Sequence, residues 1–130
     1  CYGGGVELVS CFDNVIATPG SLFGLWQRRI GLTFGWGGEE RLNKRMGSHR
    51  MQSWLLRAQT VSSYQALEWG LVDQVALESE ALTIARNWLQ KVLSFGEENF
   101  SEVKSSNGKQ ETVFQELWMG KRHKKILDQF

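Results

Sequence analysis

The chain has 130 residues, of which 42% are hydrophobic and 22% are charged, and its formal net charge at pH 7 is +1. This length predicts one domain or part of one, with enough apolar residues for a packed core. A net charge so near zero gives no bulk attraction to nucleic acid, and no apolar run approaches the roughly 18 residues of a membrane-spanning helix. We therefore expect no nucleic-acid partner and no membrane partner.

The two cysteines, Cys1 and Cys11, lack the spacing of a metal site and are too few for a disulfide framework. They predict reduced thiols in an intracellular protein of the cytoplasm or the mitochondrial matrix, and no metal site is predicted. No targeting segment is visible. Because the chain begins inside a glycine turn, we expect upstream residues, and any targeting segment with them, to be missing.

The first residues predict a turn, a helix and two short strands. Gly3-Gly4-Gly5 predicts a tight turn into a helix over residues 6–12, because only glycine enters positive φ freely. Apolar runs at 15–17 and 22–23 predict short strands, separated by the turn signal Thr18-Pro19-Gly20.

Two helices are predicted after a glycine–aromatic loop at residues 34–38. Acidic residues favour a helix N-terminus at residue 39, and this helix is expected to stop at Gly47, a good C-terminal cap. Ser48 is expected to cap the next helix, which carries the apolar residues of 51–56.

Ser62 and Gln65 fit a capping box, which predicts a helix that ends at Gly70. The alternation over residues 71–75 then predicts a strand.

The remaining chain is predicted to be mostly helical. Apolar residues recur at helical spacing over 81–93, which is the clearest amphipathic helix of the sequence. Residues 101–110 are polar and predict a loop, residues 113–118 predict another helix, and residues 126–130 form a last apolar edge. Short strands and helices followed by a helical tail indicate an α/β fold.

Six segments, in this order and at this spacing, together resemble the second half of the enoyl-CoA hydratase/isomerase (crotonase) family. They are GGGVEL, DNVIA, LFG, IGLTFGWGGEERL, MGS and SSYQALEWGLVDQV. The resemblance implies that residues 1–76 are the C-terminal part of a crotonase core built as a ββα spiral. It also implies that residues 77–130 are a helical C-terminal region used for oligomerisation, so we expect a homo-oligomer, either a trimer or a hexamer.

The resemblance further implies an acyl-CoA thioester as substrate, with CoA as part of that substrate and no separate cofactor. Family members stabilise a thioester enolate between two backbone N–H groups. One belongs to the middle glycine of the triple-glycine turn, which maps to Gly4, and the other to an earlier loop that this chain lacks. Fixed N–H dipoles near a helix N-terminus suit such a charge. The alternative for the glycines is close packing of a helix on a strand.

Glu7 matches the first of two glutamates that family hydratases use, and the second position holds Gln27, which cannot exchange a proton near neutral pH. An isomerase is disfavoured more strongly, because family isomerases rely on a carboxylate at this same position. The pattern resembles ethylmalonyl-CoA decarboxylase-like members, which also carry a tryptophan at the position of Trp36. A decarboxylase-type lyase is therefore the favoured interpretation. A hydratase-like enzyme with altered acid/base groups and a non-catalytic relative used in assembly remain open.

The resemblance also suggests substrate-binding residues. Trp26, Phe34, Gly35 and Trp36 are candidates for the acyl pocket, although aromatic residues are more often part of a core. Lys121 and Lys124 are candidates for contacts with the CoA phosphates of a neighbouring subunit, against the alternative of a solvated basic face. For Glu7 the alternative role is to stabilise a helix dipole, and for Gln27 it is a polar place at the rim of the site.

Overall fold

The computed structural model describes residues 1–96, 100–105 and 109–129. The chain forms two compact units, Cys1–Arg86 and Asn87–Phe130. In chain order the elements are α1 (Gly4–Val9), β1 (Ile16–Ala17), β2 (Leu22–Gly24), the 3-10 helix η1 (Gln27–Ile30), α2 (Gly38–Met46), α3 (Ser48–Arg57), β3 (Thr60–Ser62), α4 (Ser63–Glu68), β4 (Gln74–Val75), α5 (Glu78–Ser94), α6 (Phe100–Ser105), α7 (Gln110–Leu117) and α8 (Lys121–Leu127). The predicted family boundary at residue 76 falls between β4 and α5 and stays a prediction.

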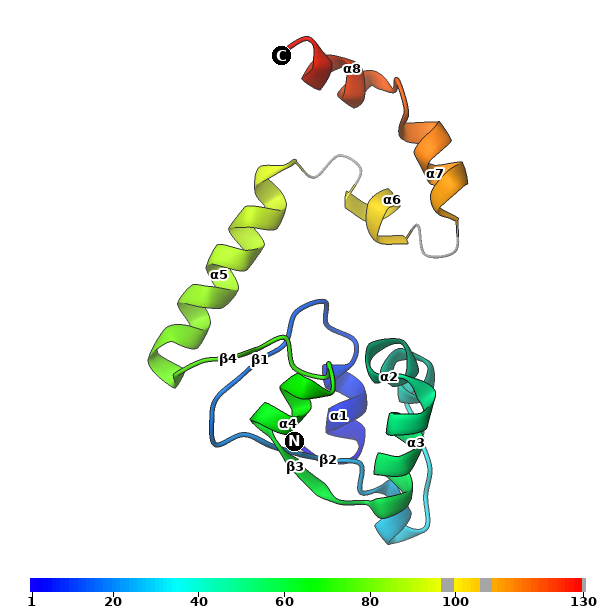
Figure 1. Ribbon diagram of the computed structural model, residues 1–130, viewed down its shortest axis with the longest axis vertical. Helices are drawn as coiled ribbons and strands as arrows, with labels where there is room; N and C mark the ends of the chain where they lie inside the picture. The colour runs from blue at the N-terminus through cyan, green and yellow to red at the C-terminus, as the bar shows by residue number, and fades with distance from the viewer. Residues whose placement is uncertain (97–99, 106–108, 130) are drawn as a thin grey trace. The chain divides into compact units, whose positions relative to one another are not determined.

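The first unit is built around one cluster of buried side chains, in which Trp54, Leu25 and Leu42 are the largest that are fully buried. Helix α1 packs against α2, and α2 packs against α3 (Figure 1). The expected mixture of short strands and helices in residues 1–76 is confirmed.

The triple glycine turns the chain into α1, as predicted. Gly3 has a φ of 53°, a conformation that favours glycine, and its N–H donates to the Gly24 carbonyl at 2.8 Å. The helix is shorter than the predicted span of 6–12. It begins at Gly4 and ends at Val9, and a turn then leaves Phe12 58% exposed.

Two small sheets hold distant segments together. Strands β1 and β4 pair in parallel, with Ala17 opposite Val75, while β2 and β3 pair antiparallel, with Phe23 opposite Val61. Both predicted strands at 15–17 and 22–23 are present, whereas β3 was not expected from the sequence.

Glycines lie at both ends of α2, and the second also precedes α3. Gly37 caps the N-terminus of α2 with a φ of 70°, and Gly47 follows its last residue with a φ of 83°. The prediction that Ser48 caps α3 is wrong. Gly47 occupies that position, and Ser48 is the first helical residue and makes no side-chain cap.

The predicted cap of α4 is present, because the Ser62 hydroxyl accepts from the Gln65 N–H at 3.3 Å. The strand predicted at 71–75 is limited to its last two residues. Leu71 and Val72 instead donate their N–H groups to the Ala66 carbonyl, at 2.9 and 3.2 Å, and both side chains are buried.

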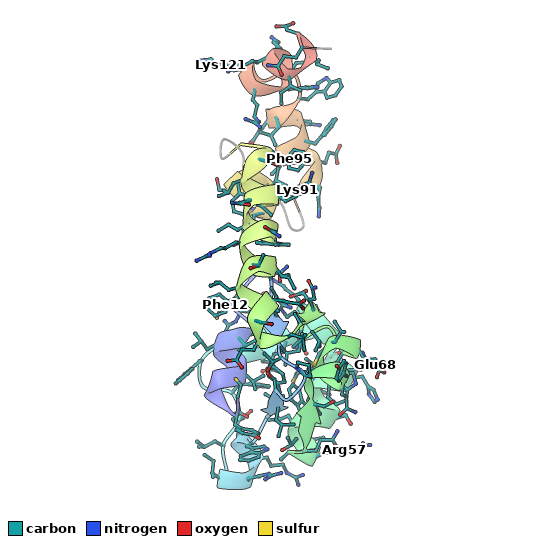
Figure 2. The ribbon with its side chains drawn as sticks, turned by 90° about the vertical axis from the view of Figure 1, so that its left-hand side faces the viewer. Phe12, Arg57, Glu68, Lys91, Phe95 and Lys121 are labelled. Carbon is teal, nitrogen blue, oxygen red and sulfur yellow. The ribbon has the colours of Figure 1, made fainter. Side chains whose placement is uncertain are left out.

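The predicted helix over 81–93 is confirmed within α5, which runs from the first unit into the second. Near its end, the Lys91 ammonium lies 5.1 Å from the centroid of the Phe95 ring (Figure 2). The loop predicted at 101–110 is wrong over residues 101–105, which belong to α6, where Phe100 and Val103 recur at helical spacing. Residues 106–108 of that predicted loop lie outside the described residues. Among the described residues, none of the helices is both long and apolar enough to cross a membrane.

Candidate functional site

A cavity of about 560 Å³ opens beside the N-terminus of α1, between that turn, η1 and the loop that precedes α2. Its walls bring together six of the residues singled out from the sequence. They are Gly4, Glu7, Trp26, Gln27, Gly35 and Trp36. Side chains or backbone of Tyr2, Gly3, Arg29, Ile30, Leu32 and Thr33 complete the lining.

Gly4 presents an unused backbone donor at this cavity. The N–H groups of Gly3 and Gly5 donate to backbone carbonyls at 2.8 and 3.0 Å, whereas the Gly4 N–H makes no hydrogen bond within the described residues. A Cβ atom added at Gly4 would lie 3.0 Å from the indole ring of Trp36. The ring of Trp36 therefore supplies a local reason for glycine at this position.

The Glu7 carboxylate is buried, with 2% of the residue exposed, and accepts four hydrogen bonds. Its Oε2 accepts from the N–H groups of Trp36 at 2.9 Å and Gly38 at 3.0 Å. Its Oε1 accepts from the Gln27 amide at 3.0 Å and the Gly35 N–H at 3.3 Å. Because Gly38 begins α2, the negative charge also lies at the positive end of that helix.

These contacts set the protonation state of Glu7. Burial alone raises the pKa of the carboxyl, but the hydrogen bonds from Trp36, Gln27, Gly38 and Gly35 outweigh it and hold the pKa below the usual 4.5. The carboxylate therefore stays ionised near neutral pH. With both oxygens occupied by donors, it is a poor proton carrier and a firm anchor for the loop.

Gln27 is also buried, and its orientation follows from its neighbour. An amide nitrogen must face the Glu7 carboxylate, because two acceptors would repel each other, so the Nε2 group donates at 3.0 Å. The Oε1 atom then points elsewhere and has no partner within the described residues. Gln27 is therefore part of the buried wall of the cavity and does not lie at its rim.

Trp26 is the centre of a stack on the wall of the cavity. The Tyr2 ring lies 3.9 Å from it between centroids, and the Arg29 guanidinium carbon lies 4.3 Å from its centroid. Sequence reasoning singled out Trp26 but missed Tyr2 and Arg29. The spacing of Trp26 and Arg29, three residues apart, was the available signal, since such residues are neighbours on a helical turn.

One predicted pocket residue lies elsewhere. Phe34 packs against the buried core and is not among the residues that line the cavity, which corrects its expected place on the wall. Lys121 and Lys124 are exposed on α8 in the second unit, and their expected contacts with the CoA phosphates of a neighbouring subunit stay a prediction.

Arg41 is a positioning residue that sequence reasoning missed. Its guanidinium donates to the Trp36 carbonyl at 2.8 Å and to the Glu7 carbonyl at 3.3 Å. Its Nε–H also donates to the Ser10 hydroxyl at 3.0 Å. Arg41, on α2, thus connects the end of α1 to the loop between η1 and α2.

Short strands and helices around one cavity form an α/β fold. The comparisons identify its class as crotonase-like, because the sequence model described as "Enoyl-CoA hydratase/isomerase" matches residues 1–121. The chain belongs to the enoyl-CoA hydratase/isomerase family.

Individual relatives are named for two kinds of reaction. The chain is 33% identical over 92 residues to the short-chain-enoyl-CoA hydratase of Clostridium acetobutylicum, covering 71% of this chain and 35% of the relative. It is 38% identical over 89 residues to the ethylmalonyl-CoA decarboxylase of Xenopus laevis, covering 67% of this chain and 30% of the relative. The chain therefore spans about a third of the length of these relatives.

A solved structure supports the same fold. An enoyl-CoA hydratase/isomerase family protein from Hyphomonas neptunium superposes with a TM-score of 0.66 at 29% identity. The match covers 71% of this chain and 35% of that protein.

Proposed function

We propose that the chain is part of an acyl-CoA-processing enzyme whose cavity stabilises a thioester enolate, and that its reaction is the decarboxylation of a malonyl-type thioester. One observation carries the choice of reaction. Glu7 is the one carboxylate among the described residues that line the cavity, and both of its oxygens are occupied by donors.

The proposed oxyanion donor is the Gly4 N–H. It lies at the start of α1, at the cavity wall, and makes no hydrogen bond within the described residues. A thioester oxygen placed there would meet a fixed dipole that needs no reorganisation as negative charge develops. Losing one such donor typically costs about 3–4 kcal/mol of transition-state stabilisation.

Decarboxylation asks little more of the protein than this. The bond between the α-carbon and the carboxylate breaks, its electron pair moves through the enolate to the thioester oxygen, and CO2 leaves. A proton from water then forms the new C–H bond, and the hydroxide that remains is neutralised by solvent. No step needs a side chain that changes its protonation state, which agrees with the ionised Glu7 and the amide of Gln27.

Hydration of an enoyl thioester is the second candidate, because relatives at 33% identity from Clostridium acetobutylicum and Syntrophomonas wolfei are named short-chain-enoyl-CoA hydratase and crotonyl-CoA hydratase. Hydration needs a group that takes a proton from the attacking water. Gln27 cannot do this, and the donors around Glu7 make it a weak base. A non-catalytic relative that serves in assembly is the third candidate.

Product analysis separates these candidates. The protein is incubated with methylmalonyl-CoA, ethylmalonyl-CoA and crotonyl-CoA, and each product is followed by mass. The proposal predicts loss of CO2 from the first two and no water addition to the third. Hydration of crotonyl-CoA alone contradicts it, and no turnover of any substrate favours the non-catalytic relative.

Two substitutions at Gly4 test the oxyanion role. Both Gly4→Ala and Gly4→Pro introduce a Cβ against the Trp36 ring, but only proline removes the N–H. Proline is tolerated at the first position of a helix, which Gly4 occupies. The expected result is a kcat that is about 10²–10³-fold lower for Gly4→Pro than for Gly4→Ala. Equal rates would remove Gly4 from the mechanism.

A further inference from the structure

Arg29 is the one cationic side chain among the described residues that line the cavity, and the reaction proposed above gives it no role. Its guanidinium is held in two ways. The Nε–H donates to the Ala58 carbonyl at 2.9 Å, and the guanidinium carbon lies 4.3 Å from the centroid of the Trp26 ring. The first contact fixes the reach of the side chain and the second fixes its plane.

The outer nitrogens of Arg29 remain available. The two Nη groups carry four N–H bonds, and none of them donates to another residue in the described part of the chain. Such a planar pair of donors matches the two oxygens of a carboxylate. The Glu7 carboxylate lines the same cavity but does not pair with Arg29. Both Glu7 oxygens instead accept hydrogen bonds from Gln27, from the loop before α2 and from the first residue of α2.

We propose that Arg29 binds the free carboxylate of a malonyl-type acyl group, so that the cavity selects thioesters that carry a second acid. This inference rests on the proposed function and names its substrate class. Both groups lie on one cavity of about 560 Å³, where the Gly4 N–H serves the thioester oxygen and Arg29 the carboxylate. The two ends of a short dicarboxylate thioester are thereby recognised by different donors.

The energetics make Arg29 a specificity residue. A carboxylate that leaves as CO2 loses its charge in the reaction, so a contact with it stabilises the bound substrate at least as much as the transition state. Arg29 is therefore expected to lower KM without raising kcat. This split separates recognition from a purely structural role, in which a loosened site would lower kcat as well.

The test compares ligands that differ by one carboxylate. For the wild-type chain, Arg29→Gln and Arg28→Gln, kcat and KM are measured with methylmalonyl-CoA. Propionyl-CoA and free CoA, which have no carboxylate to lose, are titrated by calorimetry into the same three proteins. Arg28 is a matched control, because it donates to the Leu56 carbonyl and does not line the cavity. We expect Arg29→Gln to raise the KM for methylmalonyl-CoA about five- to tenfold, as for a partly solvated charged pair, and to leave propionyl-CoA binding unchanged. Arg28→Gln should behave like the wild type.

Any other outcome contradicts the role of Arg29, the proposed function or both. Equal weakening of all three ligands by Arg29→Gln would place Arg29 on a CoA phosphate and remove the carboxylate assignment. An unchanged preference for methylmalonyl-CoA would remove Arg29 and leave the proposed function standing, whereas a wild-type chain that binds neither thioester removes both. If Arg29→Gln fails to fold, Arg29→Lys keeps the charge without the planar pair of donors, and a preference equal to the wild type again contradicts the proposal.

Discussion

Replacing Glu7 by glutamine tests whether its carboxylate anchors the loop in front of α2. Each carboxylate oxygen accepts two hydrogen bonds, from Gln27 and Gly35 on one side and from Trp36 and Gly38 on the other. If the new NH2 group faces Gln27 and Gly35, the Gln27 amide can turn over so that its Oε1 accepts, and only the Gly35 N–H loses its acceptor. The opposite orientation leaves both the Trp36 and the Gly38 N–H groups without an acceptor. At least one buried donor is thus unsatisfied at a cost of about 1–3 kcal/mol, so Glu7→Gln should lower the free energy of unfolding by at least about 1–3 kcal/mol.

Urea denaturation followed by circular dichroism measures this loss, with Glu40→Gln as the control. Glu40 is an exposed acid whose carboxylate pairs with the Lys44 ammonium at 2.8 Å, and its removal should leave the unfolding curve unchanged. A loss below about 1 kcal/mol for Glu7→Gln would be no more than an ordinary substitution causes, and would refute the anchoring role.

The anchoring role also predicts a dependence on pH, because the folded pKa of Glu7 lies below its usual 4.5. The ionised Glu7 carboxylate stabilises the fold fully above pH 4.5, and this stabilisation is lost as the pH falls through the folded pKa. In urea denaturation at a series of pH values, the difference in unfolding free energy between wild type and Glu7→Gln should therefore narrow below pH 4.5. A constant difference would contradict this. Gly38→Ala places a Cβ 2.5 Å from the Glu7 Cγ and should cost about 1–3 kcal/mol in urea denaturation. Its control Gly20→Ala meets no atom within 4 Å and should be neutral or slightly stabilising, so equal effects would dismiss the contact. Leu42→Ala, at a fully buried position, should cost about 2–5 kcal/mol by the same measurement, whereas Leu56→Ala, at a residue 58% exposed, should cost far less.

Local signals in the sequence predicted much of the fold. The glycines at 3 and 47 mark backbone with positive φ, and the Ser62 cap needs only its neighbour three residues later. The helical spacing in 81–93 likewise predicts α5, since periodicity is a property of one segment. By contrast, β3 is three residues long and exists because it pairs with β2, which no local pattern records.

The site was also predicted only in part, because short motifs identify residues but not their contacts with distant segments. The family motifs located Gly4, Glu7 and Gln27, which meet at one cavity. They did not predict that Glu7 would accept from Trp36 and Gly38, which lie 29 and 31 residues further along the chain. Phe34 was misplaced because an aromatic residue beside a glycine loop fits either a pocket or a core, and only the packing decides.

The proposal that the Gly4 N–H receives the thioester oxygen has a direct test. Amide chemical shifts of the isotopically labelled chain are recorded during titration with propionyl-CoA, and again with free CoA, which lacks the thioester carbonyl. We predict that the Gly4 amide proton moves downfield with propionyl-CoA and stays in place with CoA. A Gly4 resonance that remains unmoved while other cavity residues respond to saturating propionyl-CoA would contradict the account.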